Sequence, residues 1–361
     1  MEPSRARQLW RRATESKLFF PIVLLAFILF VDSLLVPGFF TIQSRGINLY
    51  GSLIDIVRNA STIMLLAIGM TLVIATGGVD LSVGAVMAIA ASVAALLMNP
   101  YVLAKELPPN LMRLITDPHF TYQPLWVVIA VTLLVAILCG LWNGMLVAYV
   151  RIQPMVATLI LMIAGRGIAQ LITNGVRIQI FYEPYAFIGQ GWLVLPFSLY
   201  LVAIVYALTW LLTRRTAIGL FIESVGINAR ASFFSGISEK HIKLLAYVIC
   251  AVCAGLAGLV ASANVRTSDA NNIGLADELD AILAVVIGGT VLGAGGRFSL
   301  LGSLLGAIVM QAVTTSMYAV GVAAFALQAI NGVVVIGVIL LYSDQARSFL
   351  RSLGTRKEAP S

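Results

Sequence analysis

The chain has 361 residues, of which 60% are hydrophobic and 11% are charged. Soluble domains carry about 25% charged residues, so this composition excludes a soluble globular protein and indicates a polytopic membrane protein. The net charge of +7 does not indicate nucleic-acid binding, because the basic residues lie in the segments between apolar stretches.

Ten apolar stretches predict ten transmembrane helices. In chain order they are residues 18–36, 53–75, 81–98, 125–150, 155–172, 192–212, 244–263, a span that begins near Asp280, 298–318 and 323–341. No cleavable signal peptide is expected, because the first stretch is long enough to stay in the membrane. The expected fold class is therefore an all-α polytopic membrane protein with broken helices, formed by a single domain over residues 1–361.

Lysine and arginine are distributed unevenly around these spans. If both termini are cytoplasmic, 16 of the 23 Lys and Arg residues lie on the cytoplasmic side. The segments that hold them are the tail 1–17, Arg151, the loop 213–243, Arg297 and the tail 342–361. This bias follows the positive-inside rule. An odd number of spans would place one terminus on the wrong side, so the charges favour ten.

The third span follows a break in the apolar pattern. The stretch Gly69–Ala91 is interrupted at Thr76–Ser82, which reads TGGVDLS. A charged residue within a span costs about 2.5–3.5 kcal/mol on insertion scales, and broken helices occur at membrane depth only where they line a cavity or are buried in protein. Two interpretations stay open: Asp80 caps the next helix in a surface turn, or the break lies on a translocation path.

Other polar residues lie inside or beside the spans. Asn143 belongs to a stripe with Gly140 and Gly144, a spacing that lets two helices approach closely. Arg166 lies within the fifth span, where it either ties the helix to a carboxylate or to backbone carbonyls, or contacts a passing solute. The candidate residues of the path are Asp80, Ser82, Asn143, Arg166 and Asp280.

A weakly similar segment lies in the second half of the chain. Val73–Ala90 and Val286–Ile308 each run from an apolar stretch through a double glycine and a polar break to a helix of small residues. Interrupted segments at corresponding places in two halves indicate a translocation site between repeats.

Enzymatic motifs are missing from the sequence. It contains no HExxH, no GxSxG and no Cys/His cluster, and Cys250-x-x-Cys253 is interpreted as helix packing. No lysine follows a glycine, which excludes a P-loop. We therefore expect no catalytic residue, cofactor or metal in this chain, and any ATP is hydrolysed by another chain. The alternative is a proton- or sodium-coupled carrier with Asp80 and Asp280 as the ion-linked groups.

Four blocks, in chain order, carry a resemblance to a known family: TLVIATGGVDLSVGAVMAIAA, PMVATLILMIAGRGIAQLIT, AIGLFIESVGINARASFFSGI and LDAILAVVIGGTVLGAGGRF. They resemble the signature blocks of ribose-type carbohydrate ABC importer permeases. Within that family, MLLAIGMTLVIATGGVDLSVGAVMAIA and DANNIGLADELDAILAVVIGG most resemble permease subunits of galactofuranose importers.

The resemblance implies an importer of a monosaccharide in the bacterial inner membrane. Two permease subunits, identical or related, would surround a central path, with cytoplasmic ATP-binding subunits on one side and a periplasmic sugar-binding protein on the other. The loop 213–243 matches the segment that couples such permeases to the ATPase, although a plain solvated loop stays the alternative. We expect helices there, broken at Gly226 and ended by Gly236. The residues that hold the coupling motif are Glu223, Gly226, Asn228, Ala229, Ala231 and Gly236.

Overall fold

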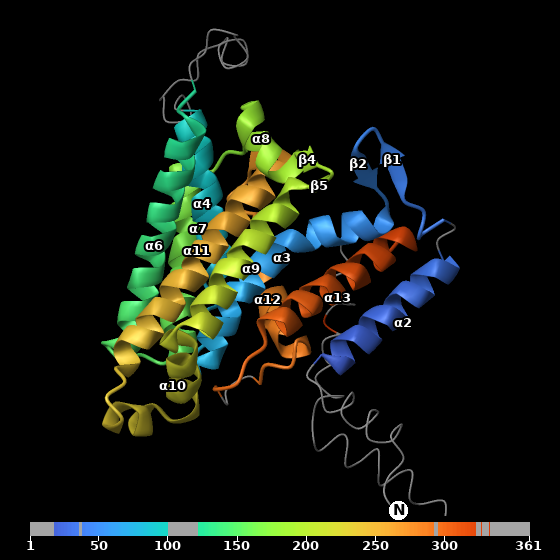
Figure 1. Cartoon of the computed structure of the whole chain (residues 1–361). Coiled ribbons are helices and arrows are strands. Elements are labelled where there is room, and N and C mark those ends of the chain that lie inside the picture. Colours follow the sequence, from blue (N-terminus) through green and yellow to red (C-terminus); the bar gives the residue numbers. More distant parts are fainter. Residues whose placement is uncertain are drawn as a thin grey trace, which may run out of the picture.

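The computed structural model describes residues 18–35, 38–99, 122–291 and 295–322, together with positions 326 and 332. This part of the chain is almost entirely helical (Figure 1). Both predicted tails and most of the tenth predicted span lie outside the described residues.

Six of the described helices are long and apolar enough to cross a membrane. They are α3 (Ser52–Ala75), α6 (Leu125–Ala148), α7 (Pro154–Ile172), α9 (Phe197–Arg215), α11 (Glu239–Val265) and α13 (Leu300–Ala319). The shorter helices α2 (Phe19–Leu35), α4 (Val83–Met98) and α12 (Asp277–Ile287) occupy the first, third and eighth predicted spans. The structure therefore shows a multi-pass helical protein, while the count of ten stays a prediction.

The seventh span begins earlier than expected. We predicted its start at Leu244, whereas α11 starts at Glu239. Glu239 and Lys243 lie one turn apart on this extension and form an ion pair of 3.8 Å, a spacing at which opposite charges support a helix. Hydropathy alone does not detect this polar first turn.

The short elements lie at the two ends of the molecule. Helix α10 (Ala217–Phe234) lies at one end, and α8 (Glu183–Gln190) lies at the opposite end (Figure 1). Three antiparallel strand pairs complete the fold: β1 (Gln43–Arg45) with β2 (Asn48–Tyr50), β3 (Ile178–Gln179) with β6 (Thr267–Ser268), and β4 (Trp192–Leu193) with β5 (Leu195–Pro196). We refer below to the α10 end and the α8 end.

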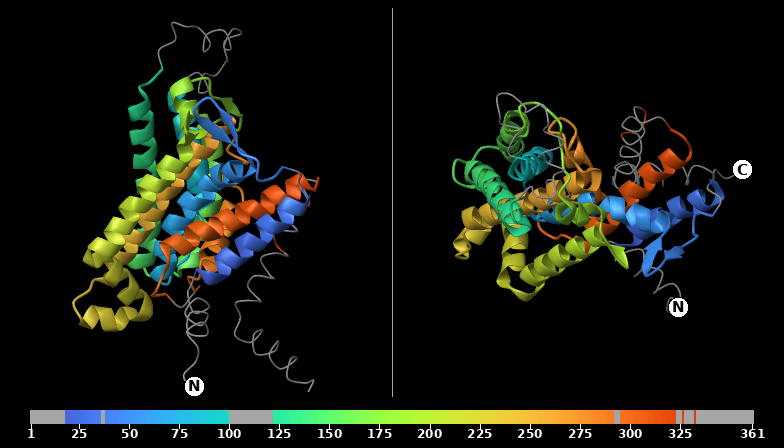
Figure 2. Two further views of the ribbon diagram at one scale, coloured as in Figure 1. Left: turned by 45° about the vertical axis from the view of Figure 1, so that its right-hand side comes forward. Right: turned by 90° about the horizontal axis from the view of Figure 1, so that it is seen from above.

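Helix α11 is the centre of the bundle and packs against α6, α3 and α4, while α13 and α2 run side by side on the flank away from α6 (Figures 1 and 2). Glycines allow the close contacts of α11. A Cβ atom at Gly69 of α3 would lie 2.7 Å from the Cα of Cys250, and one at Gly140 of α6 would lie 2.8 Å from the Cα of Val248. The small-residue stripe predicted around Asn143 therefore does pack against a neighbouring helix.

The cysteines belong to this packing. Cys250 and Cys253 are buried in α11, Cys139 in α6 is half-buried, and all three are free thiols. The described residues contain no group of His, Cys, Asp or Glu side chains that could hold a metal ion. Cys250 and Cys253 both lie where α11 packs against α3 at Gly69, as the helix-packing interpretation of Cys250-x-x-Cys253 predicts.

We predict that Gly69→Ala destabilises the protein, because the added methyl group meets the backbone of α11. Overpacking of this kind costs about 1–3 kcal/mol. Thermal unfolding of the detergent-solubilised chain measures the effect as a lower melting temperature. The matched control is Gly167→Ala in α7, where an added Cβ has no atom within 4 Å. Equal melting temperatures for the two variants would contradict the packing argument.

Candidate functional site

The predicted break is present between two helices at the centre of the bundle. Helix α3 ends at Ala75 and α4 begins at Val83. The intervening polar residues are enclosed, since Asp80 is 1% exposed and Ser82 is fully buried. Buried non-helical backbone at membrane depth needs hydrogen-bond partners within the protein.

Three of the predicted path residues come together at this break. The Asp80 Oδ1 atom accepts hydrogen bonds from the Ser82 backbone N–H at 2.9 Å and from the Ser82 hydroxyl at 2.7 Å. The Asn143 amide, which comes from α6, donates to the Ser82 Oγ at 2.7 Å and to the Asp80 Oδ1 at 3.4 Å. We call Asp80, Ser82 and Asn143 the break cluster. It fixes the entry into α4 against α6.

The capping interpretation of Asp80 needs one correction. The N-cap residue of α4 is Ser82, and its side chain makes no capping hydrogen bond to the helix. The Asp80 carboxylate binds the N–H of Ser82 itself, two residues further along the chain. Asp80 therefore closes a short turn ahead of the helix, which is a local pattern that aspartate commonly adopts.

Two residues that the sequence did not single out also hold the break. The Thr158 hydroxyl of α7 accepts a hydrogen bond from the Leu81 N–H at 3.1 Å. The Tyr247 hydroxyl of α11 donates to the Val79 carbonyl at 3.3 Å. A Cβ at Gly78 would lie 2.6 Å from that hydroxyl, so a side chain at this position would displace the tyrosine hydroxyl from the break.

Arg166 is held by backbone carbonyls. Its guanidinium donates to the carbonyl oxygens of Ala270 at 3.0 Å, Ile273 at 2.5 Å and Gly274 at 3.1 Å. This geometry confirms the expectation that Arg166 ties α7 to backbone carbonyls. Contact with a passing solute stays a prediction. The arginine fixes the loop that leads directly into α12.

Asp280 lies apart from the break cluster. It occupies the first turn of α12 together with Asp277 and Glu278. Glu278 is 6% exposed, and its carboxylate lies against α4 at Gly84, where an added Cβ would be 2.4 Å from the Glu278 Oε2 atom. Among the described residues, no hydrogen bond joins Asp280 to the break cluster. Sequence reasoning grouped Asp280 with Asp80 but missed Glu278, which it assigned to an external loop.

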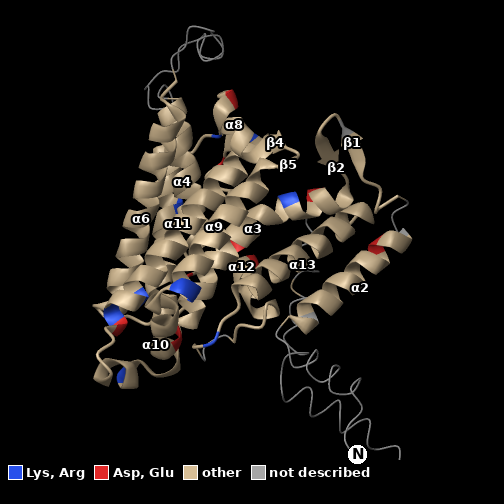
Figure 3. Cartoon of the chain, in the orientation of Figure 1, with Lys and Arg blue, Asp and Glu red and all other residues tan. Residues whose placement is uncertain are grey.

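The loop predicted to carry the coupling motif contains α10, and Figure 3 shows lysines and arginines gathered around this end of the molecule. The predicted break at Gly226 is wrong, because the helical geometry is interrupted at Asn228, with φ −156° and ψ 96°. The Asn228 Oδ1 atom accepts a hydrogen bond from the Ala231 N–H at 3.0 Å and so caps the short helix that follows. Gly236 has a φ of 82°, which confirms it as the end of this unit.

Gly226 has a different role from the predicted one. A Cβ at this position would lie 1.9 Å from the Ala75 carbonyl oxygen and 2.3 Å from the Gly296 nitrogen. The Gly296 N–H donates a hydrogen bond to the same Ala75 carbonyl at 2.8 Å. We call this three-way contact of Ala75, Gly226 and Gly296 the backbone junction. It joins α10 to the residue at which α3 ends.

Two further motif residues, Glu223 and Ala229, line grooves at the α10 end. Glu223 lines a cavity of about 330 Å³ together with Arg214 and Arg297. Ala229 lines a larger groove of about 850 Å³, which the predicted cytoplasmic turn at Arg151 and the start of α11 also line. The turn at Arg151 and the loop with α10 are therefore parts of one surface. Ala231 contributes its N–H to the Asn228 cap.

Comparison with known families decides what kind of protein this is. The sequence profile of the family described as "Branched-chain amino acid transport system / permease component" matches residues 52–343. The chain belongs to this family. It is a membrane permease component, and this assignment favours a translocation subunit of an ABC transporter over an enzyme or an ion-coupled carrier.

Individual relatives agree with the family. The permease is 45% identical over 93% of its length to the galactofuranose transporter permease protein YtfT of Escherichia coli K12, of which it covers 92%. It is 36% identical over 86% of its length to the fructose import permease protein FruF of Bifidobacterium longum, covering 82% of that chain. It is 31% identical over 89% to the ribose import permease protein RbsC of E. coli K12, covering 92%. No solved structure matches the chain. The resemblance drawn from the four sequence blocks is thereby confirmed.

We predict that Asp80→Leu impairs assembly or transport. Leucine cannot accept the hydrogen bonds from Ser82 and Asn143, and each buried donor left unpaired costs about 1–3 kcal/mol. Asp80→Asn retains a carbonyl oxygen in the same place and should be milder. The measurements are folded yield, melting temperature and substrate uptake.

The control for this prediction is Asp55→Leu, at an exposed aspartate in the first turn of α3. Normal uptake and yield for Asp80→Leu would show that the carboxylate is a dispensable turn residue. An equal loss in Asp55→Leu would show that the effect is not specific to the break cluster.

Proposed function

We propose that this permease is the membrane-spanning subunit of an ATP-driven importer of a monosaccharide, with galactofuranose or a ribose-like sugar as the substrate. The observation that carries this proposal is the 45% identity to a galactofuranose permease over almost the whole chain. Relatives that are named for fructose and ribose support a sugar as the substrate class.

The proposal extends to the arrangement in the membrane. The whole chain acts as one domain of ten spans in a bacterial inner membrane, with the tails 1–17 and 342–361 and the loop 213–243 in the cytoplasm. The charge bias supports this orientation, which places the α10 end inside. Asp80, Ser82, Asn143, Arg166 and Asp280 line or brace the path. The break cluster is supported in this role by its place at an interrupted helix.

The partners follow from the function. A separate ATP-binding subunit hydrolyses ATP in the cytoplasm, because the permease sequence has no P-loop. A periplasmic sugar-binding protein delivers the substrate, and a second permease subunit, identical or related, completes the path. The permease itself needs no cofactor.

The backbone junction explains how a motor outside the membrane can act on the path. Glu223, Gly226, Asn228, Ala229, Ala231 and Gly236 form or flank α10, the segment proposed to contact the ATPase. Through Gly226, α10 touches the Ala75 carbonyl without an intervening side chain, and Ala75 directly precedes the break. A displacement of α10 is therefore passed to the end of α3 and to the break cluster.

Reconstitution tests the importer directly. We predict that the purified permease alone hydrolyses no ATP. Sugar uptake into proteoliposomes should require the partner ATPase, and its rate should depend on the ATP concentration. The control is the same complex with an ATPase variant that binds but does not hydrolyse ATP. Uptake that follows a proton or sodium gradient and ignores ATP depletion would replace the importer with an ion-coupled carrier.

We predict that Gly226→Val abolishes coupling while the chain still inserts into the membrane. The valine side chain would overlap the Ala75 carbonyl and the Gly296 nitrogen, so α10 has to move away from α3. The measurement is ATPase turnover of the assembled complex, with and without loaded binding protein. Stimulation by the loaded binding protein should be lost.

Two variants calibrate this result. Gly167→Val makes the same change in α7, where no atom lies within 4 Å of an added Cβ, and it should retain stimulation. Glu223→Ala should be mild, because an ion pair between Glu223 and a basic residue of a partner groove would contribute only about 0–1 kcal/mol. Stimulation and uptake that survive in Gly226→Val would exclude α10 as the coupling element and favour the turn at Arg151.

A further inference from the structure

A cavity with both polar and apolar walls lies between the α8 end of α11 and the start of α12. Its volume is about 490 Å³, within the range of about 300–1,000 Å³ that is typical of small-molecule sites. The polar lining is formed by Arg177, Thr267, Asp269, Asn272 and Asp277, and Val265 contributes an apolar wall. These residues are distinct from the path residues inferred above.

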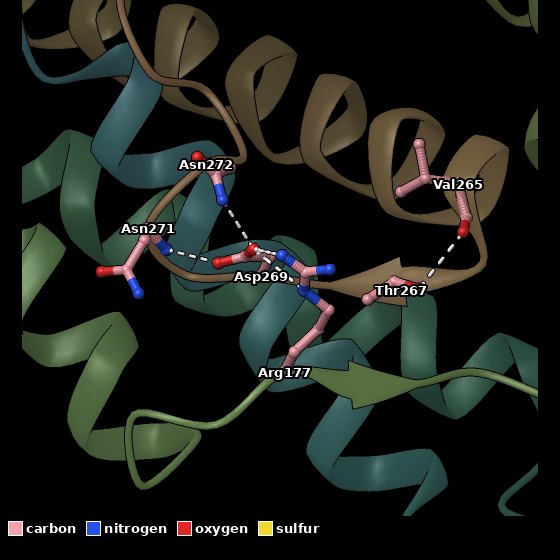
Figure 4. Close-up of polar contacts among 6 residues, drawn as sticks. All are labelled: Arg177, Val265, Thr267, Asp269, Asn271 and Asn272. Carbon is pink, nitrogen blue, oxygen red and sulfur yellow. Dashed lines mark hydrogen bonds and ion pairs between the residues drawn. The ribbon is translucent and has the colours of Figure 1, made fainter.

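Asp269 organises this cavity (Figure 4). Its Oδ2 atom accepts hydrogen bonds from Arg177 at 2.8 and 3.1 Å and from the Asn272 amide at 2.7 Å. Its Oδ1 atom accepts the Asn271 N–H at 3.0 Å. Partial burial acts to raise the pKa of Asp269, but these hydrogen bonds and the arginine charge outweigh it and hold the pKa below its ordinary value. The carboxylate therefore stays ionised at neutral pH.

The cavity is built on fixed backbone. Strand β3, which follows Arg177, pairs with β6, which precedes Asp269. From the other side, Arg166 holds the carbonyls of Ala270, Ile273 and Gly274. The loop that lines the cavity is thus held at both of its ends, by the β3–β6 strand pair and by Arg166. A ligand would therefore meet a preformed site.

Several hydrogen-bonding groups in the lining remain available. Arg177 uses Nε and Nη2 for Asp269, and its side chain is 65% exposed, which leaves Nη1 as a donor. Within the described chain, the Asp277 carboxylate takes part in no hydrogen bond although it lines the cavity. The Asn272 carbonyl and the Thr267 hydroxyl add acceptors beside them.

This combination of groups selects a class of ligand. Burial and the neighbouring carboxylates Asp280 and Glu278 raise the pKa of Asp277 to about 7, so its carboxyl group is both a donor and an acceptor near neutral pH. An anion such as phosphate would face the ionised Asp269, and a metal cation would face the arginine. A neutral polyhydroxylated molecule satisfies both, because each hydroxyl is a donor and an acceptor and hydrogen bonds to charged groups are strong. We propose that this cavity is a binding site for a monosaccharide at the α8 end, separate from the break cluster. The inference rests on the proposed sugar-import function and adds a place where this chain itself contacts the sugar.

Saturation-transfer NMR on the full-length permease in nanodiscs tests the site, with D-ribose, D-fructose and D-galactose as probes. We expect at least one sugar to give a signal with the wild-type chain. Asp277→Asn and Arg177→Lys should each weaken binding about tenfold, the effect of losing one hydrogen bond to the sugar. The lysine still pairs with Asp269 but loses the second amino group. Melting temperatures identify misfolded variants. If either variant is misfolded, sugar binding by Asn272→Ala, which changes another residue of the cavity lining, tests the site instead.

The matched control is Glu183→Gln. Glu183 lies at the same end and pairs with Arg266 at 2.6 Å, but it does not line the cavity, so its sugar signal should equal that of the wild type. No signal with any sugar overturns the site. So does a signal that is unchanged in folded Asp277→Asn and Arg177→Lys.

Uptake by the reconstituted importer separates this inference from the proposed function. If the wild-type complex transports sugar, we expect Asp277→Asn to lower the maximal uptake rate at saturating loaded binding protein. An unchanged rate would overturn the sugar site but leave the importer function standing. If the wild-type complex shows no ATP-driven uptake although the chain binds sugar, the importer is overturned and the site stands.

Discussion

Backbone groups released by a break inside a membrane protein must find partners on neighbouring helices, and the architecture of this permease is arranged around that requirement. Three helices each supply one side chain to the Thr76–Ser82 segment. Glycines bring α3 and α6 into close contact with α11, and this places two of these side chains, Asn143 and Tyr247, beside the break. If α11 packed loosely, the polar groups of the break would lose their hydrogen-bond partners. Close apolar packing is therefore a condition for the hydrogen bonds of the break.

The same segment connects the two ends of the molecule. On the α10 side, the Ala75 carbonyl is shared between Gly226 and Gly296. On the α8 side, Arg166 binds the loop that leads into α12, and the Glu278 carboxylate lies against α4. Helix α4 thus begins at the break and contacts the α12 entrance within its own first turn, at Gly84. Backbone contacts have little freedom to absorb a displacement, and this makes the arrangement suitable for transmitting one.

Much of this could be read from the sequence. Apolar stretches predicted the positions of the helices of membrane length, because hydropathy and length decide membrane insertion. The start of the sixth predicted span at residue 192 was wrong, because the apolar residues before Phe197 form the strands β4 and β5 and α9 begins only there. The motif TGGVDLS predicted the break, because two glycines and an aspartate are rare and costly in a span. The stripe that contains Asn143 predicted a close helix contact. The sequence also grouped Asp80, Ser82 and Asn143 as candidate path residues, and the structure brings these three side chains together in one cluster.

Other features depend on contacts between distant segments. Thr158 and Tyr247 look like ordinary residues of apolar helices, and only the fold brings their hydroxyls to the break. Gly226 was assigned to a turn because glycine in an amphipathic segment often ends a helix, whereas its need for glycine arises from Ala75, far away in the chain. The cavity around Asp269 was missed for the same reason, since Arg177 comes from a stretch of sequence far from the residues 261–277 that form the rest of it.

The placement of the cysteines has a practical consequence. Cys250 and Cys253 are enclosed between helices and Cys139 is half-buried, so water-soluble thiol reagents have little to react with in the native chain. A single cysteine introduced at an exposed position would then stand out against a low background of labelling. Fluorescent or spin labels can be attached to the permease without first removing its own thiols, two of which pack where α3 meets α11.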